Sequence, residues 1–131
     1  MNGLQLGVAY HGNRMLRHVE EDMRDIVKHN FNLVVHMFTH NDMKRHKNVM
    51  ADIFKATKDE GLDFWVDNWG IGGPPGDNSH ILQYLTDAHQ VLSDGSADPV
   101  RACLTSPEFI SFTKEWVYMV KECGGEKLFW D

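Results

Sequence analysis

Four short apolar runs, with helical periodicity between them, constrain the fold of this 131-residue chain more than any other feature of its sequence. The runs predict strands at Leu4–Tyr10, Phe31–Phe38, Leu62–Trp69 and Lys127–Asp131. The centre of the second run, Leu33-Val34-Val35, is apolar on both faces, which is typical of a parallel strand covered on both sides. Alternating strands and helices favour parallel strands joined by right-handed crossovers. We therefore predict an α/β fold in one domain spanning residues 1–131.

Three of the segments between these runs carry helix signals. From Met15 the apolar residues fall three or four positions apart with charged residues between them, as on an amphipathic helix. Ser106 offers a hydroxyl cap, and Pro107 is well suited to the first helical position. The predicted helices lie between Met15 and Asn30, between Asn48 and Gly61, and between Ser106 and Gly125.

The remaining segments predict loops and one small helix. Thr39–Lys47 is polar and is predicted to be a loop, while the glycines and prolines of Gly70–Asn78 exclude a helix or regular strand. A short helical stretch begins at Ser79, and Ser93-Asp94-Gly95 is a predicted turn. The predicted order is therefore β-α-β-α-β-α-α-β. The Gly70–Gly76 segment lacks the Gly-Lys-Ser/Thr ending of a nucleotide-binding loop, so we expect a rim loop there.

Composition excludes several classes of function. The net charge of −6 gives no electrostatic reason to expect nucleic acid or an anionic membrane as a partner. No apolar run approaches the ~20 residues of a membrane helix, and the first residues lack the pattern of a signal peptide. Two cysteines are too few for a disulfide framework. We therefore predict a cytoplasmic protein without membrane, nucleic-acid or cofactor partners.

Polar residues directly follow the apolar runs, whereas the beginnings of the runs carry no comparable set of polar residues. Because ligands of parallel α/β proteins lie at the carboxyl ends of the strands, this asymmetry predicts a site there. Asp67 and Asp131 are the candidate catalytic carboxylates, since glycoside hydrolysis uses two carboxyl groups. The candidate substrate-binding residues are Tyr10, His11, His36, Asn68, Trp69 and Trp130.

The histidines leave a metal site open as an alternative. His36 and His40 would be ~13 Å apart on a strand, too far for one ion unless the chain bends at Thr39. A site formed by His11, His36 and an aspartate is a second arrangement, and histidines that bind ligand or backbone are the third. We assign no metal ligand from the sequence.

Several motifs resemble a known family. They are "GVAYHGNR" at the first run, "VVHMFTHND" at the second, "FWVDNWGIGG" at the third, and "ACLTSPEFISFTKEW" followed by "LFWD". Together they resemble the amino-terminal half of glycoside-hydrolase-like TIM-barrel proteins. The resemblance implies a half TIM barrel of four parallel strands, and four strands in 131 residues extrapolate to roughly 260 for eight. An open sheet wound on both faces is the competing architecture.

The resemblance also carries an expectation about activity. The fourth-strand motif of such barrels is similar to Trp-Asp-Glu-Pro, with the glutamate as general acid/base, and Trp130 and Asp131 match its first two positions. The glutamate would come next, and Pro74-Pro75 departs from the more open glycine loop of the family. The implied function is thus a fragment of a carbohydrate-active barrel, inactive alone. The alternatives are a metal-dependent isomerase-like barrel and a non-catalytic ligand-binding barrel.

Half a barrel would leave the outer strands with unpaired backbone groups and the inner face of the sheet uncovered. Leaving several aliphatic side chains in water would cost ~1.5–3 kcal/mol each. We therefore expect a symmetric homodimer, in which two copies either cover each other's inner faces or close an eight-stranded pseudo-barrel by pairing the first strand of each copy with the fourth of the other.

Overall fold

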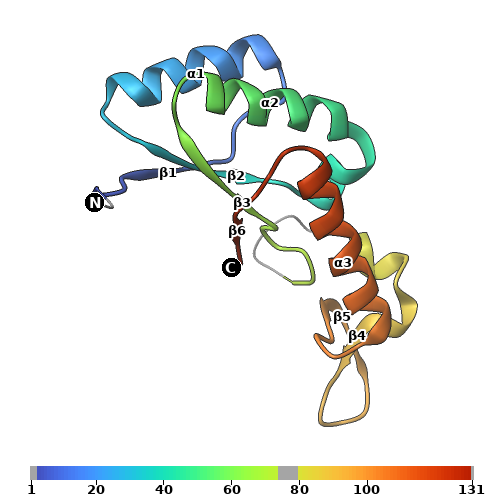
Figure 1. Cartoon of the computed structure of the whole chain (residues 1–131). Helices are drawn as coiled ribbons and strands as arrows, with labels where there is room; N and C mark the ends of the chain where they lie inside the picture. Colours follow the sequence, from blue (N-terminus) through green and yellow to red (C-terminus); the bar gives the residue numbers. More distant parts are fainter. Residues whose placement is uncertain (1–2, 74–79, 131) are drawn as a thin grey trace.

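The computed structural model describes residues 3–73 and 80–130 and is a mixed α/β fold (Figure 1). Its main elements are β1 (Gly7–Tyr10), α1 (Leu16–Lys28), β2 (Leu33–Met37), α2 (Lys47–Asp59), β3 (Asp63–Asp67), α3 (Pro107–Glu122) and β6 (Leu128–Phe129). Its smaller elements are η1 (Asp42–His46), η2 (His80–Gln83), η3 (Thr86–Ala88), β4 (His89–Val91) and β5 (Ala97–Ala102).

The main sheet has the order β1-β2-β3-β6, and all its strand pairs are parallel. Val8 pairs with Val34 and Val34 pairs with Phe64, so neighbouring strands are nearly in step. The predicted parallel order of four strands is therefore confirmed. The predicted fourth strand is wrong in length and burial, because β6 has two residues and both are exposed.

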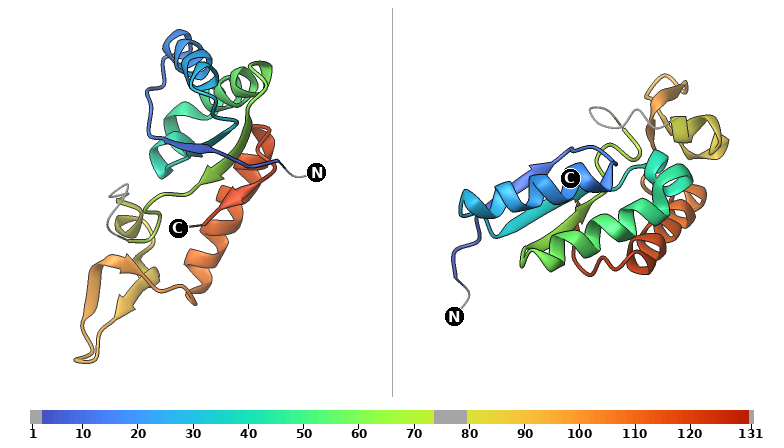
Figure 2. Two further views of the ribbon diagram at one scale, coloured as in Figure 1. Left: turned by 90° about the vertical axis from the view of Figure 1, so that its left-hand side faces the viewer. Right: turned by 90° about the horizontal axis from the view of Figure 1, so that it is seen from above.

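The helices cover one face of this sheet. α1 and α2 lie side by side above β1, β2 and β3, and α3 continues the layer beside β6 (Figures 1 and 2). Side chains alternate between the two faces of the sheet, and those that face the helices, including Val34 and Val66, are fully buried. Side chains on the opposite face, including Val35 and Trp65, are only partly buried. The other face of the sheet thus has no covering layer among the described residues, so the expectation of cover on both faces is wrong for that part of the chain.

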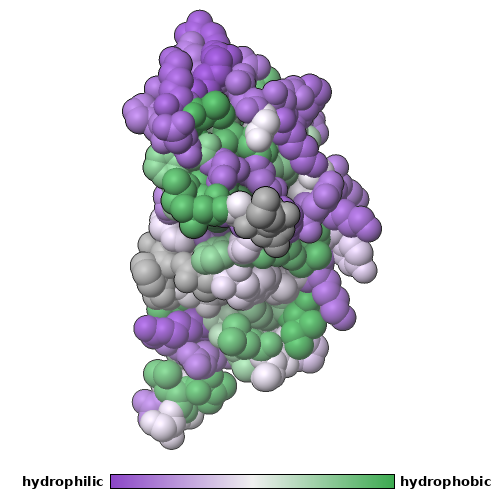
Figure 3. Space-filling model, turned by 60° about the vertical axis from the view of Figure 1, so that its left-hand side comes forward, coloured by the Kyte–Doolittle hydropathy of each residue, from purple (hydrophilic) through white to green (hydrophobic). Residues whose placement is uncertain are grey.

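The helices are amphipathic, as predicted. Val19 and Met23 of α1 are fully buried, and so are Met50 and Ile53 of α2. Their outer surfaces are polar, and Figure 3 shows this polar surface at the top of the molecule, with apolar patches lower on the same view. The apolar stripes of both helices therefore stabilise the chain against one face of the sheet, at ~1.5–3 kcal/mol per buried side chain.

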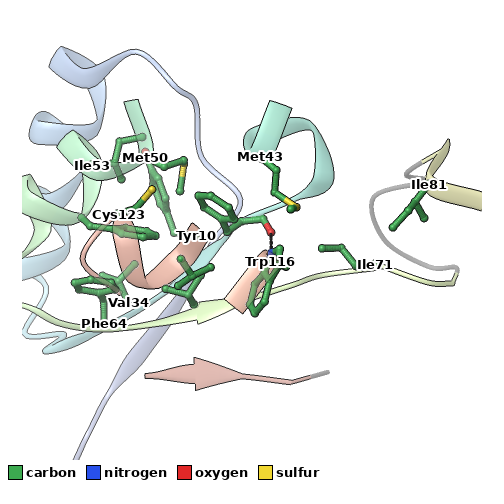
Figure 4. Packing of buried hydrophobic residues seen from close by; sticks show 14 of the residues in the cluster. Tyr10, Val34, Met43, Met50, Ile53, Phe64, Ile71, Ile81, Trp116 and Cys123 are labelled. Atoms are coloured by element: carbon green, nitrogen blue, oxygen red, sulfur yellow. Dashed lines mark hydrogen bonds between the residues drawn. The ribbon is translucent and has the colours of Figure 1, made fainter. Parts of the chain in front are cut away.

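Helix α3 is tied to the sheet by a buried hydrogen bond. Trp116 is fully buried, and its Nε1–H donates to the carbonyl of Phe38 at 2.8 Å, just past the end of β2 (Figure 4). At the start of α3 the Ser106 hydroxyl accepts a hydrogen bond from the amide of Phe109, so the predicted cap is confirmed. Satisfying these backbone groups fixes α3 against the loop that follows β2.

Three segments differ from the prediction. The polar segment Thr39–Lys47 contains the π-helical turn η1 rather than a loop, because Asp42 and Met43 are buried there. The helical stretch predicted from Ser79 forms two short 3-10 turns, η2 and η3. The predicted turn at Ser93-Asp94-Gly95 connects an antiparallel hairpin of β4 and β5 that the sequence pattern did not reveal.

A buried histidine lies between β2 and α2. The Thr57 hydroxyl donates to the carbonyl of Ile53, so it accepts from His36 Nε2–H at 2.8 Å. The proton is therefore on Nε2, and Nδ1 has no hydrogen-bond partner among the described residues. Burial, and then the nearby charge of Arg14, lower the pKa of His36 from its ordinary 6.5 to about 3. The imidazole is thus neutral at physiological pH.

We predict that protonation of His36 makes the fold sensitive to acid. The unfolded chain binds this proton near pH 6.5 and the folded chain only near pH 3, so stability is full above pH 6.5 and falls as the pH drops between these values. The expected slope is about 1.4 kcal/mol per pH unit from this residue. Urea unfolding at pH 7, 6 and 5 measures it, with His36→Leu as the non-titrating comparison. Equal pH slopes in the two proteins would contradict the assignment.

Candidate functional site

Two aromatic side chains meet at the carboxyl edge of the main sheet. His11 follows β1 and Trp69 follows β3, and their rings lie edge to face with centroids 4.7 Å apart. β2 lies between β1 and β3 in the sheet, so the two rings meet across the end of β2. This contact brings together two residues that the sequence assigned to ligand binding.

Asp67 and Asn68 lie at the same edge and are almost completely buried. Asp67 Oδ1 accepts a hydrogen bond from the amide of Trp69 at 3.1 Å, which turns the chain at the end of β3. Asn68 Oδ1 is buried and has no hydrogen-bond partner within the described part of the chain. A buried amide oxygen without a partner is costly, so this atom is a candidate acceptor for a ligand or water.

A buried ion pair holds the loops of this edge. Arg14 Nε donates to Asp42 Oδ1 at 2.7 Å, and its Nη2 donates to Asp42 Oδ2 at 2.9 Å and to the carbonyl of Met37 at 3.0 Å. The hydroxyl and amide of Thr39 also donate to Asp42. Burial alone would raise the pKa of Asp42, but the hydrogen bonds from Arg14 and Thr39 outweigh it and lower that pKa. Asp42 is therefore a structural carboxylate, which the sequence pattern did not single out.

Tyr10 and His36 point away from this edge. The Tyr10 hydroxyl donates to Asp22 Oδ2 of α1 at 2.5 Å, and burial together with Asp22 raises the pKa of the phenol. Gly12 allows this arrangement, because a Cβ at residue 12 would lie 1.9 Å from the tyrosine ring. His36 is buried under α2, with its ring near those of Tyr10, Phe54 and Phe64. The structure thus places both residues in the core between sheet and helices.

Trp130 follows β6, and its ring lies edge to face with that of Trp116 of α3, with the ring centroids 5.7 Å apart. Trp130 remains 52% exposed, so its free face is available to a ligand. Asp131, the second predicted catalytic carboxylate, lies outside the described residues. Of the predicted set, the structure therefore gathers His11, Asp67, Asn68 and Trp69, which we call the sheet-edge site.

A cavity of about 300 Å³ lies between η1, η2 and α3. His40 is in its wall, with its ring 5.6 Å from that of Phe112. The sequence pattern placed His40 after the second strand but did not predict the cavity. The cavity could not be predicted because Thr39–Lys47, which contains η1, was predicted to be a loop.

Neither a metal-ligand cluster nor a membrane-spanning helix is present in residues 3–73 and 80–130. No three His, Cys, Asp or Glu side chains in these ranges are grouped in a way that could hold a metal ion. No helix in these ranges combines the length and apolar character required to cross a membrane.

No protein-family model matches this chain, and neither does any curated protein.

We predict that the Arg14–Asp42 pair is required to hold the loops of this edge. Arg14→Ala would leave the Asp42 carboxylate buried without its cation and should cost about 3 kcal/mol of unfolding free energy. Arg14→Lys keeps the charge but loses the bidentate contact with the Asp42 carboxylate. We therefore expect an intermediate loss of unfolding free energy. Urea unfolding measures both changes.

The matched control is Arg24→Ala. It removes an exposed ion pair to Glu60 at 3.7 Å and should cost less than ~1 kcal/mol. The pair would not be a structural clamp if Arg14→Ala were as mild as this control.

Proposed function

We propose that this chain is a carbohydrate-binding α/β unit, half of a glycoside-hydrolase-like barrel, with its ligand at the sheet-edge site. The observation that carries the proposal is the contact between His11 and Trp69 across the end of β2, beside the buried polar pair Asp67 and Asn68. Carboxyl ends of parallel strands are where ligands of this fold class bind.

The chemistry of these side chains suits a sugar. A pyranose ring has an apolar C–H face, which packs on an aromatic ring such as Trp69. Its hydroxyls need hydrogen-bond acceptors, and Asn68 Oδ1 is a buried acceptor without a partner in the described chain. Asp67 supplies a carboxylate at the same edge, and we propose it as the catalytic carboxylate. A small set of fixed polar groups beside an aromatic surface is typical of small-ligand sites.

The proposal concerns binding before catalysis. Glycoside hydrolysis requires a second carboxyl group ~5–10 Å from the first. The second acid that the sequence predicts, Asp131, lies outside the described residues. We expect sugar binding to be measurable through His11, Asn68 and Trp69, independently of any hydrolysis.

Sugar binding can be tested at the indole of Trp69. In ¹H–¹⁵N spectra of the four tryptophan indoles, addition of cellobiose, maltose or lactose should shift the Trp69 signal in a saturable way. The signal of Trp116, whose indole is fully buried, should stay in place. Trp69→Ala, measured by titration calorimetry because it removes the reporter indole, should weaken binding at least about tenfold, equivalent to ~1.4 kcal/mol.

Two further variants complete this experiment. Asn68→Leu should weaken sugar binding because it removes the acceptor, while Tyr118→Ala removes an aromatic ring that is 67% exposed on α3 and should change nothing. The proposal would be rejected if none of the three sugars shifted the Trp69 signal.

We also propose that the chain forms a homodimer through the uncovered face of the sheet. Phe129 remains 39% exposed on this face beside Trp65, with ring centroids 6.4 Å apart. At the amino end of the same face, Gln5 and Lys127 both contact the carboxylate of Asp63. In a two-fold symmetric dimer, this patch on one copy packs against the same patch on the other copy.

We predict a sedimentation mass of twice 15.1 kDa at micromolar concentration. Phe129→Asp should shift the equilibrium to monomer because it buries a charge in the interface. Tyr118→Asp, on the opposite layer, should leave the dimer intact. A single folded species of 15.1 kDa would refute the dimer.

A further inference from the structure

The cavity between η1, η2 and α3 is separate from the sheet-edge site and has a different chemistry. Its volume is about 300 Å³, at the lower end of the range for small-molecule sites. Its walls are mostly apolar, with His40 among them, and come from three parts of the chain. Met43 is in η1, Ile81 is in η2, Leu85 follows η2, and Phe112 and Met119 are in α3.

These walls suit a flat aromatic group. Methionine sulfur is polarisable and packs well against ring edges, and Met43 and Met119 are both in the wall. The ring of Phe112 adds an aromatic partner, for which offset or edge-to-face geometry is favourable. Ile81 is almost fully buried and closes the cavity on the side of η2.

The cavity carries one charge of each sign. Lys44 of η1 lines it with its ammonium 3.8 Å from the centre of the Tyr84 ring, and Glu115 of α3 lines it as well. Both side chains belong to exposed residues, and neither forms an ion pair with a side chain in the described ranges. A ligand with a single charge would attract one of these groups and repel the other. A zwitterion would attract both.

We propose that this cavity binds a small aromatic zwitterion, of the chemical class of free aromatic amino acids. The ring lies among Met43, Phe112 and Met119, the ligand carboxylate faces Lys44, and the ligand ammonium faces Glu115. The apolar wall provides most of the affinity, and the two charges select the zwitterion over molecules with one charge.

The methionine methyl groups provide the measurement. With ¹³C-methyl-methionine labelling, L-phenylalanine should shift the Met43 and Met119 signals in a saturable way through ring currents. Met50 is fully buried in the core, and Met15 is exposed just before α1 and is not in the cavity wall, so their signals should not move. A titration to ~10 mM nearly fills a site of ~1 mM affinity.

Three probes and three variants test the charge pairing. L-phenylalanine should bind at least about threefold more tightly than phenylacetate or phenethylamine, as expected for an exposed ion pair. Lys44→Met should abolish its advantage over phenethylamine, and Glu115→Gln should abolish its advantage over phenylacetate. Lys114→Met, on the same helix but not in the cavity wall, should leave all three affinities unchanged.

Each remaining result overturns the proposal. Equal affinities for the three probes would show that the cavity does not select a zwitterion. If L-phenylalanine produced no saturable shift at Met43 and Met119, or equal shifts at Met15, the cavity would not be its site. The readout does not involve Trp69, so this proposal and the sugar-binding proposal can fail independently.

Discussion

The parallel register of β1, β2 and β3 is the constraint on which the rest of this structure depends. Parallel neighbours require a crossover connection, and here α1 and α2 make those crossovers on one face of the sheet. All loops that leave the strands therefore emerge at one edge. His11 and Trp69 can touch only because β1 and β3 end in step on either side of β2.

The same register decides which polar residues are in the core and which are at the edge. Residues of one parity lie under the helices, so His36 is in the core although it follows three apolar residues in the same way that Asp67 does. His36 pairs with Val66 and faces the helices, whereas Asp67 is one position further along and lies at the end of its strand. His36 is therefore a structural residue and Asp67 a candidate ligand-binding residue. His36 is tolerated there because Thr57 accepts its one proton and its pKa is too low for a second at physiological pH.

Much of this architecture could be predicted from the sequence, and the failures have physical causes. Periodicity located α1, α2 and α3 because each buries a regular apolar stripe, and Ser106-Pro107 located the start of α3. The hairpin of β4 and β5 was missed because its strands are short and mostly exposed, so they lack an apolar alternation. Tyr10 was assigned to the site because nothing local shows that its hydroxyl reaches Asp22, twelve residues away in α1. The Arg14–Asp42 pair joins the loop after β1 to η1, so local sequence patterns could not predict it either.

Two of the elements that the sequence pattern predicted least well, η1 and η2, line the cavity that we propose as a second binding site. They lie beside the end of the sheet, together with α3, and contribute nothing to its register. Loop elements of this kind can change composition without disturbing the strands, which is why scaffolds of this class support many functions. Trp116 connects the two regions, since its hydrogen bond to Phe38 fixes α3 at the end of β2. The positions of Phe112, one turn earlier, and of Glu115, the preceding residue, are thereby set by the core of the sheet. The cavity can thus be shaped by a few side chains on a helix whose position is already determined.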